Sequence, residues 1–396
     1  MREFLNSILK VPALVSSARL VKHFKFPIFR KAVANQKREN SVGTDLQALN
    51  CRVRLTKQQK EESVFDVFTV EICGSIHAPG DMHSAIVRIL IMDVTDGISK
   101  ARSVRSRVEQ RQVRDSPAFC YEAELGRIPD TDITISDWMA VARLRLDWLK
   151  FPRKGKRNVQ FATSILSGRN GEELAHATHT IAYENSAFGY IDLQENIRQA
   201  KTLAVALAFA VSAADGKLYN CEIETIKSWA GANIDFSKAS NNTKHKLEKA
   251  LNRTAEFFCD GNQLDVHRVC KEIAEFAPLA VRYDILDLCL HVAGANGVVI
   301  AEELGLLKNL ADWLEVDTDR FREMMGKILP VGMHEVKDLE LMLGLSSDMS
   351  RNETRQRLNR EYRKWNARVT NSDPEIRMQA DSMLDFIAKA RTEYVA

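Results

Sequence analysis

At residues 205–216 the chain reads Val-Ala-Leu-Ala-Phe-Ala-Val-Ser-Ala-Ala-Asp-Gly, and after five more residues comes Glu222. At residues 286–297 it reads Leu-Asp-Leu-Cys-Leu-His-Val-Ala-Gly-Ala-Asn-Gly, and Glu303 follows at the same spacing. Both copies predict an apolar helix, a turn and a second helix that begins with an acidic residue. The second copy starts 81 residues after the first, so the pattern indicates a duplicated helical unit.

The turn in each copy consists of an acid or amide followed by glycine. Gly216 and Gly297 follow Asp215 and Asn296, and glycine can end a helix in the left-handed conformation. An acid in the first turn of the next helix is then favoured by the helix dipole. Helix capping alone explains every residue of the pattern. The alternatives are a divalent-cation site and an acidic surface for a partner.

These residues resemble the TerB tellurite-resistance domain and the related N-terminal region of the DjlA co-chaperone, over roughly residues 193–329. In that family the corresponding acids form a cluster proposed to bind metal. By this resemblance the metal-binding positions are Asp215, Glu222, Asn296 and Glu303. Asn296 stands where the family prefers aspartate, and the lost charge weakens such a site. A divalent cation is therefore the one cofactor to consider, with no cofactor as the simpler expectation.

The region before this repeat has the pattern of β-strands. Strands are expected at residues 64–73, 85–94, 139–148, 158–166 and 174–183. The last two are joined by a turn that contains Asn170-Gly171, which is a strong hairpin signal. Several short strands with turns between them predict a β-sandwich over residues 52–185.

One turn in this region is strongly basic. It predicts a surface for phosphates or acidic lipid, with a solvated hairpin tip as the alternative. The residues of this basic surface are Lys150, Arg153, Lys154, Lys156 and Arg157.

The N-terminal segment is basic and amphipathic. Residues 1–38 carry nine Lys or Arg and one acid, Glu3, with apolar residues between them. This pattern is typical of a helix that lies on an anionic membrane surface, or of an organelle transit peptide. The third interpretation is a helix that caps the next domain.

The C-terminal residues predict three helices. They span residues 336–343, residues 350–368 and the segment from Pro374 onward. Ser350 and Glu353 have the spacing of a capping box at the start of the second helix. Pro374 suits the first position of the third helix.

This C-terminal segment resembles a J-domain. Leu343-Gly344-Leu345 and Tyr362-Arg363-Lys364 stand where that family has Leu-Gly-Val/Leu and Tyr-Arg-Lys. The family's His-Pro-Asp, which stimulates the ATPase of a DnaK-type chaperone, would fall at residues 370–372, where this chain has Thr-Asn-Ser. The resemblance therefore implies a docking module rather than a working co-chaperone. Its partner-binding residues would be Tyr362, Arg363, Lys364 and Arg368.

The overall composition is that of a globular protein. The chain has 396 residues, of which 45% are hydrophobic and 28% charged, and its net charge of +3 predicts no specific binding to nucleic acid. Seven cysteines without a Cys-X-X-Cys pair favour a reducing compartment over a disulfide framework. No stretch has the roughly 20 consecutive apolar residues of a membrane span. We expect a cytoplasmic protein, with peripheral contact to an anionic membrane as an addition.

The sequence favours an adaptor over an enzyme. It lacks the motifs G-X-S-X-G, H-E-X-X-H and G-X-X-X-X-G-K-[ST]. We expect an α+β multidomain, non-enzymatic adaptor or stress-response protein that binds a protein partner, with a chaperone among the candidate partners. The alternative is a DjlA-like co-chaperone. The expected parts are a basic segment and linker (residues 1–51), a β-sandwich (52–185), an all-α TerB-like bundle (186–332) and a three-helix J-like module (333–396).

Overall fold

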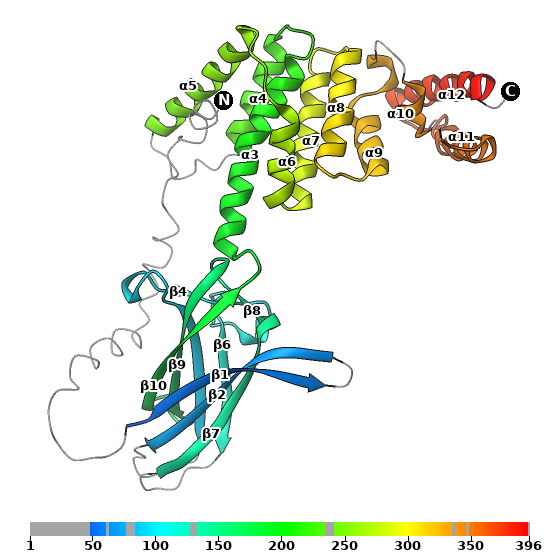
Figure 1. Ribbon diagram of the computed structural model, residues 1–396. Coiled ribbons are helices and arrows are strands. Elements are labelled where there is room, and N and C mark those ends of the chain that lie inside the picture. Colours follow the sequence, from blue (N-terminus) through cyan, green and yellow to red (C-terminus); the bar gives the residue numbers. More distant parts are fainter. Residues whose placement is uncertain are drawn as a thin grey trace. The chain divides into compact units, whose positions relative to one another are not determined.

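The computed structural model describes residues 48–60, 63–76, 84–126, 133–233, 241–334, 338–345 and 348–394. The chain divides into two compact units between Glu195 and Asn196. The first contains strands in antiparallel sheets and the second contains helices (Figure 1). This mixed architecture confirms the prediction of N-terminal strands followed by a helical region. The amphipathic segment predicted at residues 1–38 lies outside the described residues.

The first unit, hereafter the β unit, contains two main sheets. One has the strand order β1–β2–β7 and consists of β1 (Asn50–Lys60), β2 (Ser63–Ile76) and β7 (Ile133–Arg145). The other has the order β10–β9–β3–β4, with β6 also paired to β3. Its strands are β3 (Ala85–Asp93), β4 (Arg102–Ser103), β6 (Cys120–Gly126), β9 (Gly155–Ser167) and β10 (Glu173–Asn185). The short strands β5 (Arg105–Ser106) and β8 (Leu149–Lys150) pair with each other.

The two main sheets of the β unit share one hydrophobic core. Phe68 on β2 and Phe161 on β9 are fully buried, and their rings meet edge to face with centroids 5.1 Å apart. Alternation along the strands places such apolar side chains on the inner faces. Strands β9 and β10 form the predicted hairpin, in which Gly171 has a φ of 71°. Glycine adopts this left-handed conformation at little cost.

The second unit, hereafter the helical unit, begins within α3. The elements up to α9 are α3 (Tyr190–Ser212), α4 (Asn220–Asn233), α5 (Asn241–Cys259), α6 (Val266–Phe276), α7 (Leu279–Gly294), α8 (Ala301–Trp313) and α9 (Thr318–Ile328). The apolar stretches of the duplicated pattern lie on α3 and α7, and both contribute to one core cluster. A helix that is apolar on nearly all sides needs such neighbours around it. In the described part of the chain, no helix is both long enough and apolar enough to cross a membrane.

Three further helices complete the helical unit. They are α10 (Leu339–Leu343), α11 (Arg351–Asn366) and α12 (Pro374–Tyr394). Leu358 and Trp365 on α11 pack with Ile387 on α12 in a separate small core. The predicted capping box is present: the Glu353 N–H donates to Ser350 Oγ at 3.3 Å, and the Ser350 N–H donates to Glu353 Oε2 at 2.8 Å. This cap fixes where α11 begins.

Candidate functional site

The two turns of the duplicated pattern have the same construction. Asp215 Oδ1 accepts a hydrogen bond from the backbone N–H two residues later at 2.8 Å, and Asn296 Oδ1 does the same at 2.9 Å. Gly216 and Gly297 have φ values of 80° and 84°. Both glycines are therefore in the left-handed region, as the sequence predicts.

Glu222 lies at the centre of the contact between the two copies. Its carboxylate is fully buried and accepts hydrogen bonds from the Ser212 hydroxyl and, at 3.4 Å, from the Tyr219 N–H. Asn296 Nδ2, from the other copy, donates to Glu222 Oε1 at 2.8 Å. Burial raises the pKa of Glu222, and the hydrogen bonds oppose this effect. The hydrogen bond from Asn296 thus offsets part of the free-energy cost of burying the charged carboxylate.

Glu303 is buried in the same region. It accepts a hydrogen bond from the Ile300 N–H at 3.2 Å, which is the capping contact predicted for this position. Burial raises the pKa of Glu303 to about 7, and the negative charges of Glu222 and Asp215 add to the effect. The acids of the two copies therefore lie close enough to repel one another.

The acidic cluster does not have the form of a metal site. Among the described residues, which include Asp215, Glu222, Asn296 and Glu303, no group of three or more His, Cys, Asp or Glu side chains could hold a metal ion. Helix capping accounts for the backbone N–H contacts of Glu222 and Glu303, and the Ser212 hydroxyl and the Asn296 amide supply the other contacts of Glu222. Metal binding at these positions stays a hypothesis that the resemblance suggests.

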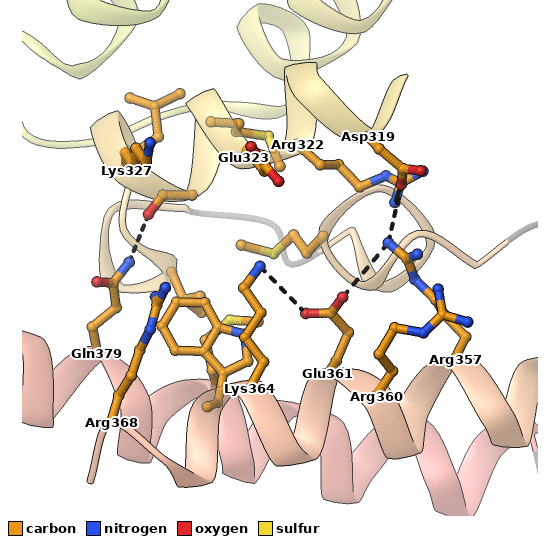
Figure 2. Close-up of a pocket in the computed structure, with 17 residues that line it drawn as sticks. Asp319, Arg322, Glu323, Lys327, Arg357, Arg360, Glu361, Lys364, Arg368 and Gln379 are labelled. Atoms are coloured by element: carbon orange, nitrogen blue, oxygen red, sulfur yellow. Dashed lines mark hydrogen bonds and ion pairs between the residues drawn. The ribbon is translucent and has the colours of Figure 1, made fainter. Parts of the chain in front are cut away.

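A second candidate site is a pocket of about 560 Å³ between α9 and the C-terminal helices (Figure 2). Its lining is strongly basic and comes from α9, from α11 and from the residues that follow α11. The basic lining residues are Arg322, Lys327, Arg357, Arg360, Lys364 and Arg368. Three acids, Asp319, Glu323 and Glu361, also line it, so its formal charge is +3.

Among the described lining residues, one ion pair joins the two walls of this pocket, and the others lie within a single wall. Asp319 on α9 accepts from Arg322 Nη1 at 2.7 Å and from Arg357 Nη2 of α11 at 3.3 Å. Burial opposes the charged form of Asp319, but the two arginines outweigh it and lower the pKa of this carboxyl. Glu361 lies 3.6 Å from Arg357 and 3.8 Å from Lys364. These two carboxylates are therefore shared among three of the six cations.

The other three basic side chains lack carboxylate partners. Within the described part of the chain, Lys327, Arg360 and Arg368 form no ion pair, and Glu323 pairs with Arg320, which is not a lining residue. These neighbouring positive charges repel each other. The pocket therefore has a net attraction for anions.

Trp365 adds a neutral donor to the pocket. It is a lining residue that is only 5% exposed, and its Nε1–H is buried without an acceptor among the described residues. The Arg368 guanidinium lies over the Trp365 ring at 4.6 Å, and Lys364 Nζ lies 5.7 Å from the ring centroid. A buried donor without a partner costs about 1–3 kcal/mol.

Only two of the four residues expected to bind a partner belong to the pocket. Lys364 and Arg368 line the pocket, whereas Tyr362 and Arg363 are not lining residues. Tyr362 is 39% exposed, and the Arg391 guanidinium of α12 lies 4.8 Å from the centroid of its ring. The sequence did not identify Arg322 and Lys327 as pocket residues, because only tertiary packing brings α9 against α11.

The basic surface predicted in the β unit is partly neutralised. Arg153 donates to Asp192 at 3.0 Å and to Glu195 at 2.7 Å, and these carboxylates raise the pKa of Arg153. Arg157 lies 3.6 Å from Asp93. The remaining members of the predicted set form no ion pair with a described residue, and Lys154 Nζ lies 5.0 Å from the ring centroid of Phe188. These remaining members are Lys150, Lys154 and Lys156.

Comparison with known families identifies one part of the chain. Residues 201–325 match the family model for tellurite resistance protein TerB. The chain therefore contains a TerB domain, which runs from α3 into α9 and includes both copies of the duplicated pattern. The match ends before α10, so it gives the resemblance of the C-terminal helices to a J-domain no support. No curated protein matches the chain.

Proposed function

We propose that the chain is a non-enzymatic adaptor that binds an acidic segment of a protein partner through the exposed basic face of α11. The observation that carries this proposal is the charge of the helix. Within residues 351–366, α11 has six basic residues and two acidic ones. On the face away from the pocket, Arg355 and Arg363 are exposed and form no ion pair with a described residue.

The surroundings of α11 favour recognition by this face. Leu358 and Trp365 anchor the helix in its core, so the exposed side chains project from a fixed backbone. Binding to a preorganised surface loses less conformational entropy. Tyr362, held beside Arg391, offers an aromatic contact next to the arginines. Charge complementarity then supplies the association rate and the specificity.

The TerB domain is consistent with such a role. A tellurite-resistance-like or adaptor protein needs a stable platform that displays a binding surface, and the helical core supplies it. The stress response that the family name suggests belongs to this proposal. A DnaK-type chaperone is one candidate partner, with the co-chaperone function as the alternative.

Titration of the full chain with a fluorescent Glu-rich peptide tests the proposal, with a Gln-rich peptide of equal length as the neutral control. We expect the acidic peptide to bind, and its affinity to fall between about 50 and about 300 mM salt as charges are screened. The double variant Arg355→Glu/Arg363→Glu should weaken binding by about tenfold or more.

The matched control for this variant is Arg114→Glu/Arg169→Glu. It makes the same change in net charge at two exposed positions of the β unit, so it should leave the affinity unchanged. Equal binding of both peptides, or equal weakening by both double variants, would show that the attraction is non-specific and would overturn the proposal.

A further inference from the structure

We infer that the pocket between α9 and α11 binds a small phosphorylated organic molecule. The site differs from the proposed docking face of α11, because Arg355 and Arg363 are not lining residues. The inference goes beyond the adaptor function, since it assigns a ligand of low molecular weight to a separate surface. Its volume of about 560 Å³ lies within the usual range of small-molecule sites.

The charge of the pocket fits a phosphate group. Lys327, Arg360 and Arg368 have no carboxylate partner among the described residues. A phosphomonoester carries about −1.5 to −2 charges near neutral pH and has three strong acceptor oxygens. A monocarboxylate would leave most of the positive charge uncompensated. Arginine and lysine are the usual partners of phosphate in proteins.

The two walls place these cations around one space. Figure 2 shows Arg322 and Lys327 on α9 opposite Arg357 and Lys364 on α11. The Asp319–Arg357 ion pair joins α9 to α11, and Gln379 Nε2 of α12 donates to the Gly326 carbonyl of α9 at 2.8 Å. The cations therefore converge before a ligand arrives, which lowers the entropic cost of binding.

The floor of the pocket is apolar. Met325 from α9, Leu329 directly after it, and Met342 and Met383 from the C-terminal helices line it. Methionine side chains adapt to ligands of irregular shape. Met342 is half-buried, and the organic part of a phosphate ester would cover the apolar surface that it exposes, whereas a free inorganic anion would not.

Trp365 also lines the pocket. Its buried Nε1–H has no acceptor among the described residues, although it belongs to a pocket that attracts anions. A phosphate oxygen is a strong acceptor for such a donor. The Arg368 guanidinium stacked on the indole ring at 4.6 Å places a cation beside it.

Isothermal titration of the full chain with naphthyl phosphate tests this inference, with inorganic phosphate and naphthol as the two partial ligands. Naphthyl phosphate should bind at least about tenfold more tightly than either one. Its binding should also shift the indole N–H resonance of Trp365, which is identified by its absence in Trp365→Phe. No binding of naphthyl phosphate, or binding that leaves this resonance unmoved, would overturn the inference.

Two double variants separate this site from the docking face. Lys327→Gln/Arg360→Gln removes two unpaired pocket charges and should weaken naphthyl phosphate by about tenfold, without affecting the acidic peptide. Arg355→Gln/Arg363→Gln removes the same charge outside the pocket and should do the reverse. Equal effects of both variants on naphthyl phosphate would contradict a specific pocket. Loss of peptide binding alone therefore bears on the adaptor function and leaves the inference unaffected.

Discussion

Glu222 and Glu303 occupy the same position in the two halves of the TerB domain, yet their surroundings differ. Both are buried and both accept a backbone N–H at a helix start. Glu222 also accepts hydrogen bonds from the Ser212 hydroxyl and the Asn296 amide, and these bonds favour its charged form. Glu303 is therefore the better residue for measuring how a buried acid affects the free energy of unfolding.

Replacing Glu303 with glutamine should make the stability of the helical unit less sensitive to pH. The pKa of Glu303 is raised from 4.5 to about 7, so the folded state holds the proton more tightly than the unfolded state. Stability that is present below about pH 4.5 is then lost as the pH rises towards about 7, by at most roughly 3 kcal/mol. Urea unfolding at about pH 5 and about pH 8, followed by helical circular dichroism, measures this loss. An equal loss in Glu303→Gln would contradict it.

Calcium or manganese should leave the melting temperature unchanged. Asn296 donates to Glu222, and this contact fills a position that a metal ligand would need. A cation bound only to the folded protein would add roughly 2.7 kcal/mol at a hundredfold excess over Kd. Differential scanning calorimetry with and without each ion checks this. A calcium-dependent rise that disappears in Glu222→Gln/Glu303→Gln would restore the metal hypothesis.

At these turns the sequence allowed the local structure to be predicted, and the family resemblance implied that the acids of the two copies cluster, but the hydrogen bond between the copies was not predicted. The Asp-Gly and Asn-Gly turns and the acids at the helix starts depend on neighbouring residues alone. The hydrogen bond from Asn296 to Glu222 joins residues that are 74 positions apart. No local rule indicates such a pairing, so Asn296 could be interpreted only as a lost charge.

Helix α11 contributes basic residues to two different surfaces. Its basic side chains reach the pocket on one side and the exposed face on the other. The Ser350 capping box predicted where the helix begins. Its packing against α9, which creates the pocket, could not be predicted because hydrophobic periodicity identifies a buried face but not the neighbour that covers it.

Replacing Leu358 with alanine should destabilise this arrangement. Leu358 is completely buried in the small core shared with α12, and truncation of such a leucine costs about 2–5 kcal/mol. Thermal unfolding of the full chain measures the loss. Leu279→Ala is the matched control, since Leu279 is 50% exposed and its truncation should cost little. Similar effects of both variants would mean that the core around α11 contributes little stability.

At the scale of the whole chain, the β unit and the helical unit each bury a core of their own. Alternation and the hairpin signal predicted the strands, the duplicated pattern predicted a helical unit, and the resemblance of that pattern to a known family predicted the TerB domain. Which charged side chains remain free was not predictable, because it depends on pairs such as Arg153 with Glu195. Such ion pairs balance part of the positive charge of the predicted basic surface of the β unit.

The full chain should not stimulate the ATPase of a DnaK-type chaperone. Residues 370–372 are Thr-Asn-Ser, and Arg377 Nη1 donates to the carbonyls of Asn371 and Ser372 at 2.7 and 3.1 Å. Steady-state ATP turnover of the host chaperone tests this, with a J-domain protein that has His-Pro-Asp as the positive control. Clear stimulation would favour the co-chaperone alternative.

The adaptor function is tested most directly by proximity labelling in the native host. The labelling enzyme is fused to the full chain, to Arg355→Glu/Arg363→Glu and to Arg114→Glu/Arg169→Glu, and the labelled proteins are quantified by mass spectrometry. We predict a defined protein with an acidic segment that is labelled by the wild type and the control variant and is lost with the α11 variant. Identical labelling by all three proteins would contradict docking on α11.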